Sequence, residues 1–203
     1  MPFVEARKLM KRLSIYLFLI LFTLQTPSLA DDISDFQIEG MSIGDSALDY
    51  FSKKEIKKNT SAVWPNKTYV QFCSDKGNFN NYEYVCFAYL KKDKKYIIHQ
   101  LNGEKDLTYN DCLKELKEVV SDTEELFKSA KKKVRENYKN RADKKGKSIG
   151  SDVQFILKDG SGAKLDCMDW SDELTKKEGW TDGLAVLLAS GKFIKWNRTK
   201  AYK

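Results

Sequence analysis

The sequence predicts an α+β protein: two short N-terminal helices, an antiparallel three-stranded meander, a long amphipathic helix and a second antiparallel sheet of about four strands. Three observations indicate this fold class. Helix-start signals crowd residues 45–59, segments rich in aromatic and β-branched residues fill 68–101, and apolar residues at helical spacing begin at Tyr109. Turn-separated apolar runs then return in residues 152–203.

The first thirty residues have the three parts of a secretory signal peptide. Basic residues within 7–12 precede the apolar run 13–24, and small residues lead to a cleavage site after Ala30. The apolar run has twelve residues, whereas a membrane-spanning helix needs about 20. We therefore predict cleavage, a mature chain from Asp31 without a transmembrane segment, and a periplasmic or secreted location.

The mature chain is predicted to have two halves. Residues 31–139 are expected to form an N-terminal α+β half ending in the long helix, and residues 152–203 a β-rich C-terminal half. Between them, residues 140–151 contain charged residues, Gly and Ser without apolar periodicity, a composition typical of a linker. Separate domains with two sheets, and one core or one sheet shared across both halves, are all compatible with this pattern.

Two short helices are expected after the leader. Ser46 precedes apolar residues at helical spacing, which indicates a capped helix over about 46–51. Ser52 and Glu55 have the spacing of a capping box, in which each side chain accepts the backbone N–H of the other residue. They predict a second helix over about 53–59.

The meander is expected at 68–74, 82–90 and 95–101, where aromatic and β-branched residues dominate. The last two segments flank a short polar sequence and are expected to form a tight hairpin. The long helix follows from Tyr109 to Lys139, with its apolar stripe thinning after Phe127.

The C-terminal half is predicted to form two β-hairpins. Residues 152–158 and 162–170 flank an Asp-Gly-Ser-Gly turn, which is a strong hairpin signal. Residues 183–190 and 192–196 are expected to pair around Ser190-Gly191, a weaker signal.

One short motif suggests chemistry. Gly44-Asp45-Ser46 resembles the opening of the GDSL lipase and esterase signature, in which the serine is a nucleophile. The next residue is Ala47 rather than Leu, and the only histidine, His99, does not stand in the late Asp-x-x-His block of that family. Serine catalysis needs a base, so we interpret Ser46 as a helix cap and His99 as a structural residue.

Two further resemblances concern longer stretches. Gly40-Met41-Ser42, the two helices and the meander, over residues 38–101, resemble the ααβββ unit of small outer-membrane-assembly lipoproteins and β-lactamase-inhibitor-like modules. That resemblance implies an adaptor or binding domain, although the lipid-bearing cysteine of the lipoproteins is missing. Residues 38–59 resemble the opening of a family of uncharacterised exported proteins from AT-rich marine bacteria, which implies a bacterial periplasmic setting.

The four cysteines are candidates for disulfides, because an exported chain meets an oxidising compartment. Cys73 and Cys86 flank the first hairpin loop and are expected to face each other. A bond from Cys112, on the helical stripe, to Cys167 would join the two halves. Free buried cysteines remain the alternative. No Cys-x-x-Cys pair is present, so we predict no metal site and no cofactor.

The positive charge of the chain is local. The formal net charge is +7, and residues 128–147 alone carry ten basic and two acidic residues. This distribution and the export signal argue against nucleic-acid binding. The segment is a candidate site for an anionic surface or an unknown envelope protein, or is simply a solvated helix face. Its candidate residues are Lys131, Lys132, Lys133, Arg135 and Lys139.

Tryptophans gather in the C-terminal half at Trp170, Trp180 and Trp196. Such residues usually belong to a core, and they also form flat platforms for carbohydrate or peptidoglycan. Carboxylates that surround them are candidates for glycosidic hydrolysis or are simply solvated loop residues: Asp166, Asp169, Asp172, Glu173, Glu178 and Asp182.

These patterns predict an exported, non-enzymatic binding or interaction module of the cell envelope. A hydrolase acting on an envelope or extracellular polymer is the alternative. The sequence has no second histidine, no metal motif and no Gly-rich phosphate loop, and this favours binding.

Overall fold

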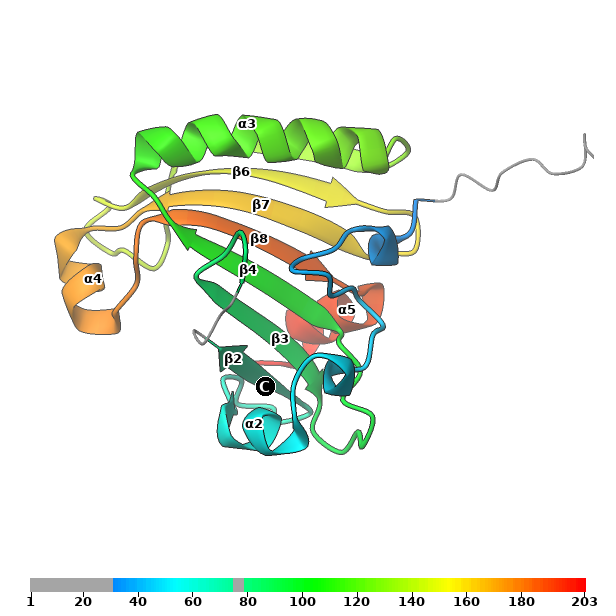
Figure 1. Cartoon of the computed structure of the whole chain (residues 1–203). Helices are drawn as coiled ribbons and strands as arrows, with labels where there is room; N and C mark the ends of the chain where they lie inside the picture. Colours follow the sequence, from blue (N-terminus) through cyan, green and yellow to red (C-terminus); the bar gives the residue numbers. More distant parts are fainter. Residues whose placement is uncertain (1–30, 75–78) are drawn as a thin grey trace, which may run out of the picture. The chain divides into compact units, whose positions relative to one another are not determined.

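The computed structural model describes residues 31–74 and 79–203, and the predicted signal peptide lies outside them. Within the described residues the chain forms one antiparallel sheet of eight strands with helices against both faces, which confirms the α+β class (Figure 1). The strands are β1 (Thr60–Ser61), β2 (Tyr69–Ser74), β3 (Tyr84–Leu90), β4 (Gln100–Asp106), β5 (Lys131–Lys139), β6 (Ile149–Ile156), β7 (Gly162–Asp169) and β8 (Gly183–Ala189). The helices are α2 (Lys53–Lys58), α3 (Tyr109–Leu126), α4 (Asp172–Glu178) and α5 (Gly191–Thr199), with 3-10 turns η1 (Ile33–Asp35) and η2 (Ala47–Asp49).

The two predicted sheets are one. The strand order is β1-β2-β3-β4-β8-β7-β6-β5, so β8 lies between β4 and β7 and joins the two halves. The register of β4 with β8 runs from Gln100↔Ala189 to Asp106↔Gly183. The expectation of two separate sheets, of three and about four strands, was wrong, and the alternative of one sheet shared across both halves is confirmed. The sequence did not decide between them, because pairing between segments so far apart leaves no local signal.

Both N-terminal helix starts are confirmed. The Ser46 hydroxyl accepts the Leu48 N–H at the start of η2, at 3.3 Å. At the start of α2, Ser52 and Glu55 form the reciprocal capping box. The third strand of the meander lies later than expected, because Tyr96 has a left-handed backbone with φ of 53° and residues 96–97 pair with Ser46 and Ala47 instead.

The long helix is shorter than predicted, and the basic segment is a strand rather than a helix. Helix α3 ends at Leu126, and residues 131–139 form β5 along β6. Apolar residues at 134 and 138 continue the helical spacing, yet Val134 lies opposite Val153 in the sheet, so a tertiary pairing overrides the local pattern. The predicted linker of 140–151 is reduced to the loop 140–148 before β6.

The expected final hairpin is also wrong. Residues 192–196 belong to helix α5, which begins where the Ser190 hydroxyl accepts the Phe193 N–H. Strand β8 already pairs with β4 on one side and β7 on the other. Because β8 has no free edge, the chain leaves the sheet and packs Phe193 and Trp196 against its face.

One face of the sheet is apolar and covered. Helix α3 packs against β7 and β8, and the segment 31–58 packs beside it over β2 to β4 (Figure 1). Side chains from all of these elements form the main core, including Ile38, Phe72, Phe87, Leu101, Leu165 and Val186. We call this the covered face.

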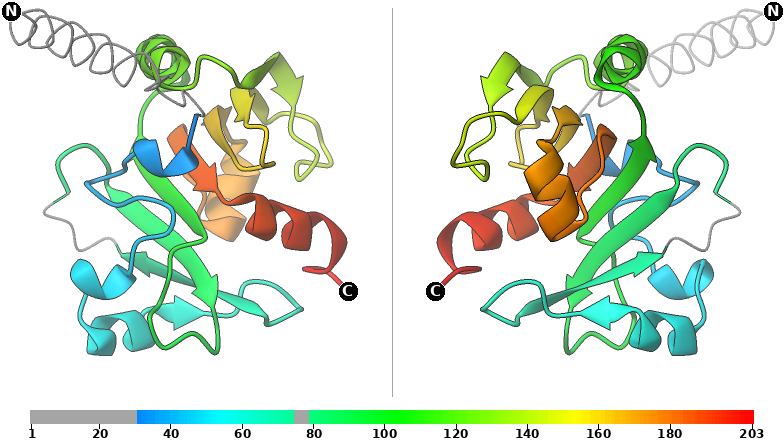
Figure 2. Two further views of the ribbon diagram at one scale, coloured as in Figure 1. Left: turned by 90° about the vertical axis from the view of Figure 1, so that its right-hand side faces the viewer. Right: turned by 90° about the vertical axis from the view of Figure 1, so that its left-hand side faces the viewer.

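The opposite face is covered at one end only. Helix α5 lies on the side of the sheet away from segment 31–58 (Figure 2). Its Phe193 and Trp196 pack with Trp64, Tyr69 and Ala189 in a second, smaller core. The remaining part of this face carries polar side chains, and we call it the open face.

Two disulfides are present, with the predicted pairings. Cys73 and Cys86 are cross-strand partners in β2 and β3, with Cα atoms 4.1 Å apart. Cys112 of α3 bonds to Cys167 of β7, and both side chains are fully buried. Disulfides are typical of an oxidising, extracytoplasmic environment. None of the helices in the described residues has the length and apolarity needed to cross a bilayer.

Candidate binding cleft

The open face carries a row of side chains that crosses six strands. Its members are in register from strand to strand, so they project from the same side of the sheet. The row consists of Tyr84 (β3), Glu104 (β4), Ala185 (β8), Asp166 (β7), Asp152 (β6) and Arg135 (β5). Glu104 and Asp166 therefore stand two strand spacings apart, about 10 Å between Cα atoms, with Ala185 between them.

Small residues in β8 leave a hollow between these acids. Ala185 and, in the next row, Gly183 stand where larger side chains would fill the face. Only glycine fits at position 183, because a Cβ there would lie 2.0 Å from the Lys105 carbonyl oxygen. The hollow has a volume of about 440 Å³, within the range of small-ligand sites.

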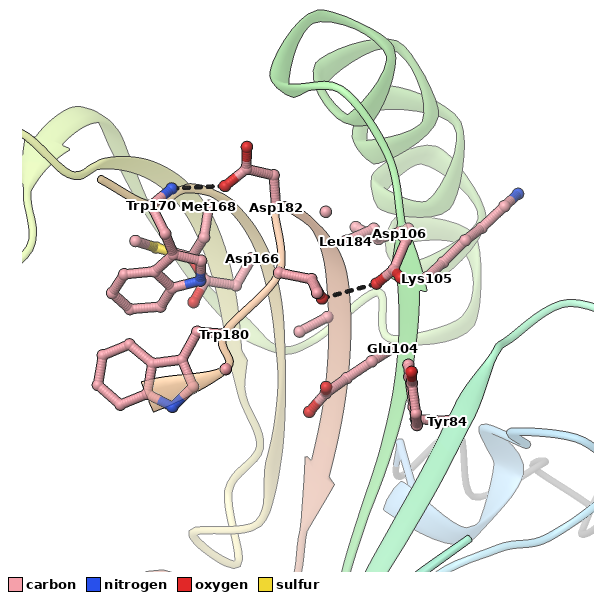
Figure 3. Close-up of a pocket in the computed structure, with 14 residues that line it drawn as sticks. Tyr84, Glu104, Lys105, Asp106, Asp166, Met168, Trp170, Trp180, Asp182 and Leu184 are labelled. Carbon is pink, nitrogen blue, oxygen red and sulfur yellow. Dashed lines mark hydrogen bonds between the residues drawn. The ribbon is translucent and has the colours of Figure 1, made fainter. Parts of the chain in front are cut away.

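Two tryptophans form the wall of this hollow (Figure 3). Trp170 precedes the short helix α4 and Trp180 follows it, with Gly179 in the left-handed conformation that ends the helix. This turn brings the indole rings to 4.5 Å between centroids, inclined at 49°. Trp180 is 38% exposed, so part of its ring is available to a ligand. We call the hollow, its acids and its tryptophans the aromatic–acidic cleft.

The carboxylates of the cleft are held by hydrogen bonds within the chain. Asp182 accepts a hydrogen bond from the backbone N–H of Trp170 at 2.6 Å, and Asp106 accepts one from the Thr181 hydroxyl at 2.7 Å (Figure 3). The Asn102 amide donates to one oxygen of Glu104. In each case one carboxylate oxygen is engaged, and the second makes no hydrogen bond within the described residues.

Asp166 is more completely engaged than the other acids. The Tyr138 hydroxyl donates to one oxygen at 3.0 Å, and the Lys164 amino group donates to the other. Lys164 and Arg135 also pair with the fully buried Asp152 in the same row. Asp166 therefore belongs to a structural ion network that runs from the cleft to the edge of the sheet.

Burial shifts the proton affinity of the central acids. The pKa of Glu104 is raised, first by its removal from solvent and further by the charge of Asp106, against the Asn102 hydrogen bond. The pKa of Asp166 is also raised by burial, although Lys164 and Tyr138 oppose the shift. Asp169 beside the cleft has a raised pKa because of burial and the charges of Asp182 and Asp172.

Acidic residues predominate among the charged residues that line the cleft. Its lining side chains include four carboxylates, from Glu104, Asp106, Asp166 and Asp182. Lys105 also lines it, but its amino group bonds to Glu115 of α3 at 2.9 Å. The cleft is therefore suited to hydroxyl donors and cations and unsuited to anions. Among the described residues, no group of three or more His, Cys, Asp or Glu is placed to hold a metal.

The structure separates the predicted basic residues. Lys131, Lys133 and Arg135 project from the open face of β5, whereas Lys132 projects from the covered face and pairs with Glu124 of α3. Lys139 lies beyond a bulge in the same strand. These residues form the outer edge of the sheet as described, where lysines also discourage edge-to-edge aggregation.

Ser46 and His99, the two residues considered for catalysis, contact different partners and not each other. The Ser46 hydroxyl donates to the Lys95 carbonyl oxygen at 2.8 Å. His99 instead packs edge-on against Tyr69 and lies 3.5 Å, Nδ1 to Oγ, from Ser190. Its pKa is lowered by burial and by the charge of Lys192. These contacts agree with a capping serine and a structural histidine.

Sequence reasoning singled out Trp170, Trp180, Asp166 and Asp182, and the structure places all four in the cleft. It missed Glu104. The alternation of polar residues in Gln100, Asn102, Glu104 and Asp106 could have indicated a strand with a solvated face. Family models, curated proteins and solved structures were all compared with this chain, and none matches it.

Proposed function

We propose that this chain is an exported binding module of the cell envelope and that its ligand is a glycan held in the aromatic–acidic cleft. The observation that supports this most directly is the Trp170–Trp180 pair beside a row of carboxylates on an uncovered part of the sheet. Indole rings offer flat apolar surfaces to the C–H face of a sugar ring, and carboxylates accept hydrogen bonds from its hydroxyl groups.

The cleft is organised before any ligand arrives. Glu104, Asp106 and Asp182 each use one carboxylate oxygen in a hydrogen bond within the chain. The other oxygen of each is available to a ligand. The strand pairing and a hydrogen bond from a backbone or side-chain donor hold each of these carboxylates in place. A site held in this way loses little conformational entropy when it binds, which favours affinity.

The acidic lining of the cleft restricts the kind of glycan that can bind there. Four carboxylates line it, and the one lysine in its lining is bonded elsewhere. Neutral sugars and amino sugars fit this potential, whereas uronic acids and phosphorylated sugars would meet like charges. A periplasmic or secreted location is part of the proposal, supported by the leader sequence and the two disulfides.

A hydrolase is the second candidate, and the raised pKa of Glu104 favours it, because a general acid must hold its proton near the working pH. Asp166, the second acid that a hydrolase would need, favours binding over hydrolysis. Asp166 has both oxygens engaged by Tyr138 and Lys164, so neither is free to attack a sugar or to activate water.

The test is a titration with neutral, amino and uronic-acid oligosaccharides, followed by tryptophan fluorescence and calorimetry. We expect neutral or amino sugars to bind and uronic acids not to bind. Trp180→Ala removes the exposed indole, and Ala185→Leu fills the hollow, so each should weaken binding by about tenfold or more. Release of reducing ends, abolished by Glu104→Gln, would favour the hydrolase.

Tyr202→Ala is the matched control, since Tyr202 is an exposed aromatic residue outside the cleft. It should bind as the unaltered protein does. If none of the three sugar classes bound, or if Tyr202→Ala weakened binding as much as Trp180→Ala, the proposal would fail.

A further inference from the structure

The aromatic–acidic cleft has another exposed aromatic residue, on the side opposite its tryptophans. Among the described residues, the exposed aromatic side chains are Tyr50, Tyr84, Trp180 and Tyr202. Two of them, Tyr84 and Trp180, line this one hollow, and each is 38% exposed. A hollow with an exposed aromatic ring on each side offers two separate stacking surfaces to a ligand.

Tyr84 is directed to the cleft by the alternation of side chains in β3. Val85 and Phe87 lie in the main core on the covered face, so Tyr84 projects from the open face, next to Glu104 of β4. Its side chain makes no hydrogen bond and no ring contact within the described residues. The Tyr50 hydroxyl, by contrast, donates to Asp45. The ring of Tyr84 is therefore not engaged by the chain itself.

The two aromatic surfaces are too far apart for one sugar ring to contact both. Tyr84 and Asp166 belong to the same row and stand three strand spacings apart, about 14 Å between Cα atoms. Figure 3 shows Trp180 on the side of Asp166 and Tyr84 on the opposite side, with the Glu104 side chain between them. A ring stacked on Trp180 therefore does not reach Tyr84.

Hydrogen-bond acceptors lie near both aromatic surfaces. Glu104 is next to Tyr84 in the row, and Asp182 accepts the backbone N–H of Trp170 beside the tryptophans. Each of these two acids keeps one carboxylate oxygen without a hydrogen bond in the described part of the chain. The small side chain of Ala185 leaves room between them. Sugar units that lay across the strands would therefore meet an acceptor near each end of the hollow.

We propose that the ligand of the cleft is an oligosaccharide of at least three linked sugar units, which lies across the strands from Trp180 to Tyr84. Linked pyranose units repeat at close to the spacing of neighbouring strands, about 5 Å, so a span of three strand spacings takes about three units. Trp180 stacks on the unit at one end and Tyr84 on the unit at the other. This inference rests on the glycan binding proposed above, and it makes Tyr84 the residue that selects for ligand length.

The test is calorimetry with the β-1,4-linked oligomers of glucose and of glucosamine, from the dimer to the pentamer. The trimer should bind about tenfold more tightly than the dimer, because only the longer ligand reaches the second aromatic surface. Tyr84→Ala should weaken binding of the trimer by about threefold or more and leave binding of the dimer unchanged. Trp180→Ala should weaken binding of both.

Two further variants separate stacking from other effects. Tyr84→Phe keeps the ring and removes only the hydroxyl, so it should bind the trimer nearly as the unaltered protein does. Tyr202→Ala removes an exposed aromatic residue outside the cleft and should change neither affinity. Because Tyr84 lies outside both cores, Tyr84→Ala should shift the melting temperature by less than about 3 °C, which separates lost binding from lost folding.

A loss in Tyr84→Ala that is confined to the trimer and longer oligomers supports the inference. Equal affinities for dimer and trimer, or an unchanged affinity of Tyr84→Ala for the trimer, would overturn it and leave glycan binding in place. Equal losses for dimer and trimer in Tyr84→Ala would also overturn it, since a short ligand would then contact both aromatic residues. If none of the oligomers bound, the proposed function would fail and this inference with it.

Discussion

The covered face and the open face of the sheet are made by alternate residues of the same strands. In β7, Leu165 and Cys167 lie in the core under α3, whereas Lys164 and Asp166 project from the open face. The covered face therefore stabilises the fold by apolar burial and a disulfide. The open face contributes ion pairs that cross the sheet and a hollow above β8. The same strand register thus provides both a core and a candidate site.

The largest expected effect is the loss of the disulfide on the covered face. Replacing Cys112 and Cys167 by Ser should lower the free energy of unfolding by about 4 kcal/mol, because the bond closes a long loop. The cysteines are separated by 55 positions, against 13 for Cys73 and Cys86.

Removing the bond between Cys73 and Cys86 should therefore cost less, about 3 kcal/mol. Urea denaturation of both double variants measures the difference. Equal losses would mean that loop length does not control the contribution of these bonds.

A single core residue should have the next largest effect. Leu165 is fully buried on the covered face, and Leu165→Ala should cost about 2–5 kcal/mol through lost contacts and a cavity. Trp180→Ala on the open face should cost less, about 1 kcal/mol, because Trp180 is 38% exposed and lies outside the main core. Thermal unfolding of the two variants compares the faces directly, and similar losses would contradict their separation into core and site.

A smaller effect is expected at Glu104, and it should depend on pH. The folded pKa of Glu104 lies above its ordinary value, so its ionisation works against folding as the pH rises through that interval. Glu104→Gln should therefore raise stability at neutral pH by less than about 1 kcal/mol, since the side chain is partly solvated. The gain should vanish below the ordinary pKa of a glutamate. Melting temperatures from pH 3 to pH 8 measure this, and a gain that persisted at low pH would point to another cause.

The smallest effect on stability is expected at the edge strand. Reversing Lys131, Lys132 and Lys133 to Glu removes exposed charges and one surface ion pair, which should change the free energy of unfolding by less than about 1 kcal/mol. If this edge binds an anionic surface or an envelope protein, the reversal should reduce crosslinking to the envelope fraction. Reversal of Lys53, Lys54 and Lys57 in α2 is the control. Equal crosslinking in both variants would remove the edge strand from consideration.

Local signals in the sequence predicted local structure well. The caps at Ser46 and Ser52 and both disulfides were found from residue types and spacing alone. Cys73 and Cys86 were predictable because a hairpin places them opposite each other. Both tryptophans and two of the four acids of the cleft were singled out because they lie close together in residues 166–182.

Long-range pairing accounts for most of what was missed. Nothing near Gln100 or Gly183 indicates that β4 and β8 pair, yet this pairing places Glu104 beside Ala185 and forms the cleft. The helix expected through Lys139 failed for the same reason, since β6 provides a partner that the local pattern does not contain. Helix α5 was missed as well, because its segment is taken for a strand as long as the two neighbours of β8 are unknown.

The central place of β8 also constrains the order in which the sheet can form. It is the last strand in the sequence, and it joins a sheet of earlier strands on either side. A nascent chain that ends before Gly183 would leave β4 and β7 with unpaired inner edges, which are prone to aggregate. The sheet can close only after residues 183–189 have been synthesised. A chain threaded through a membrane from its N-terminus would therefore cross it before its fold is complete.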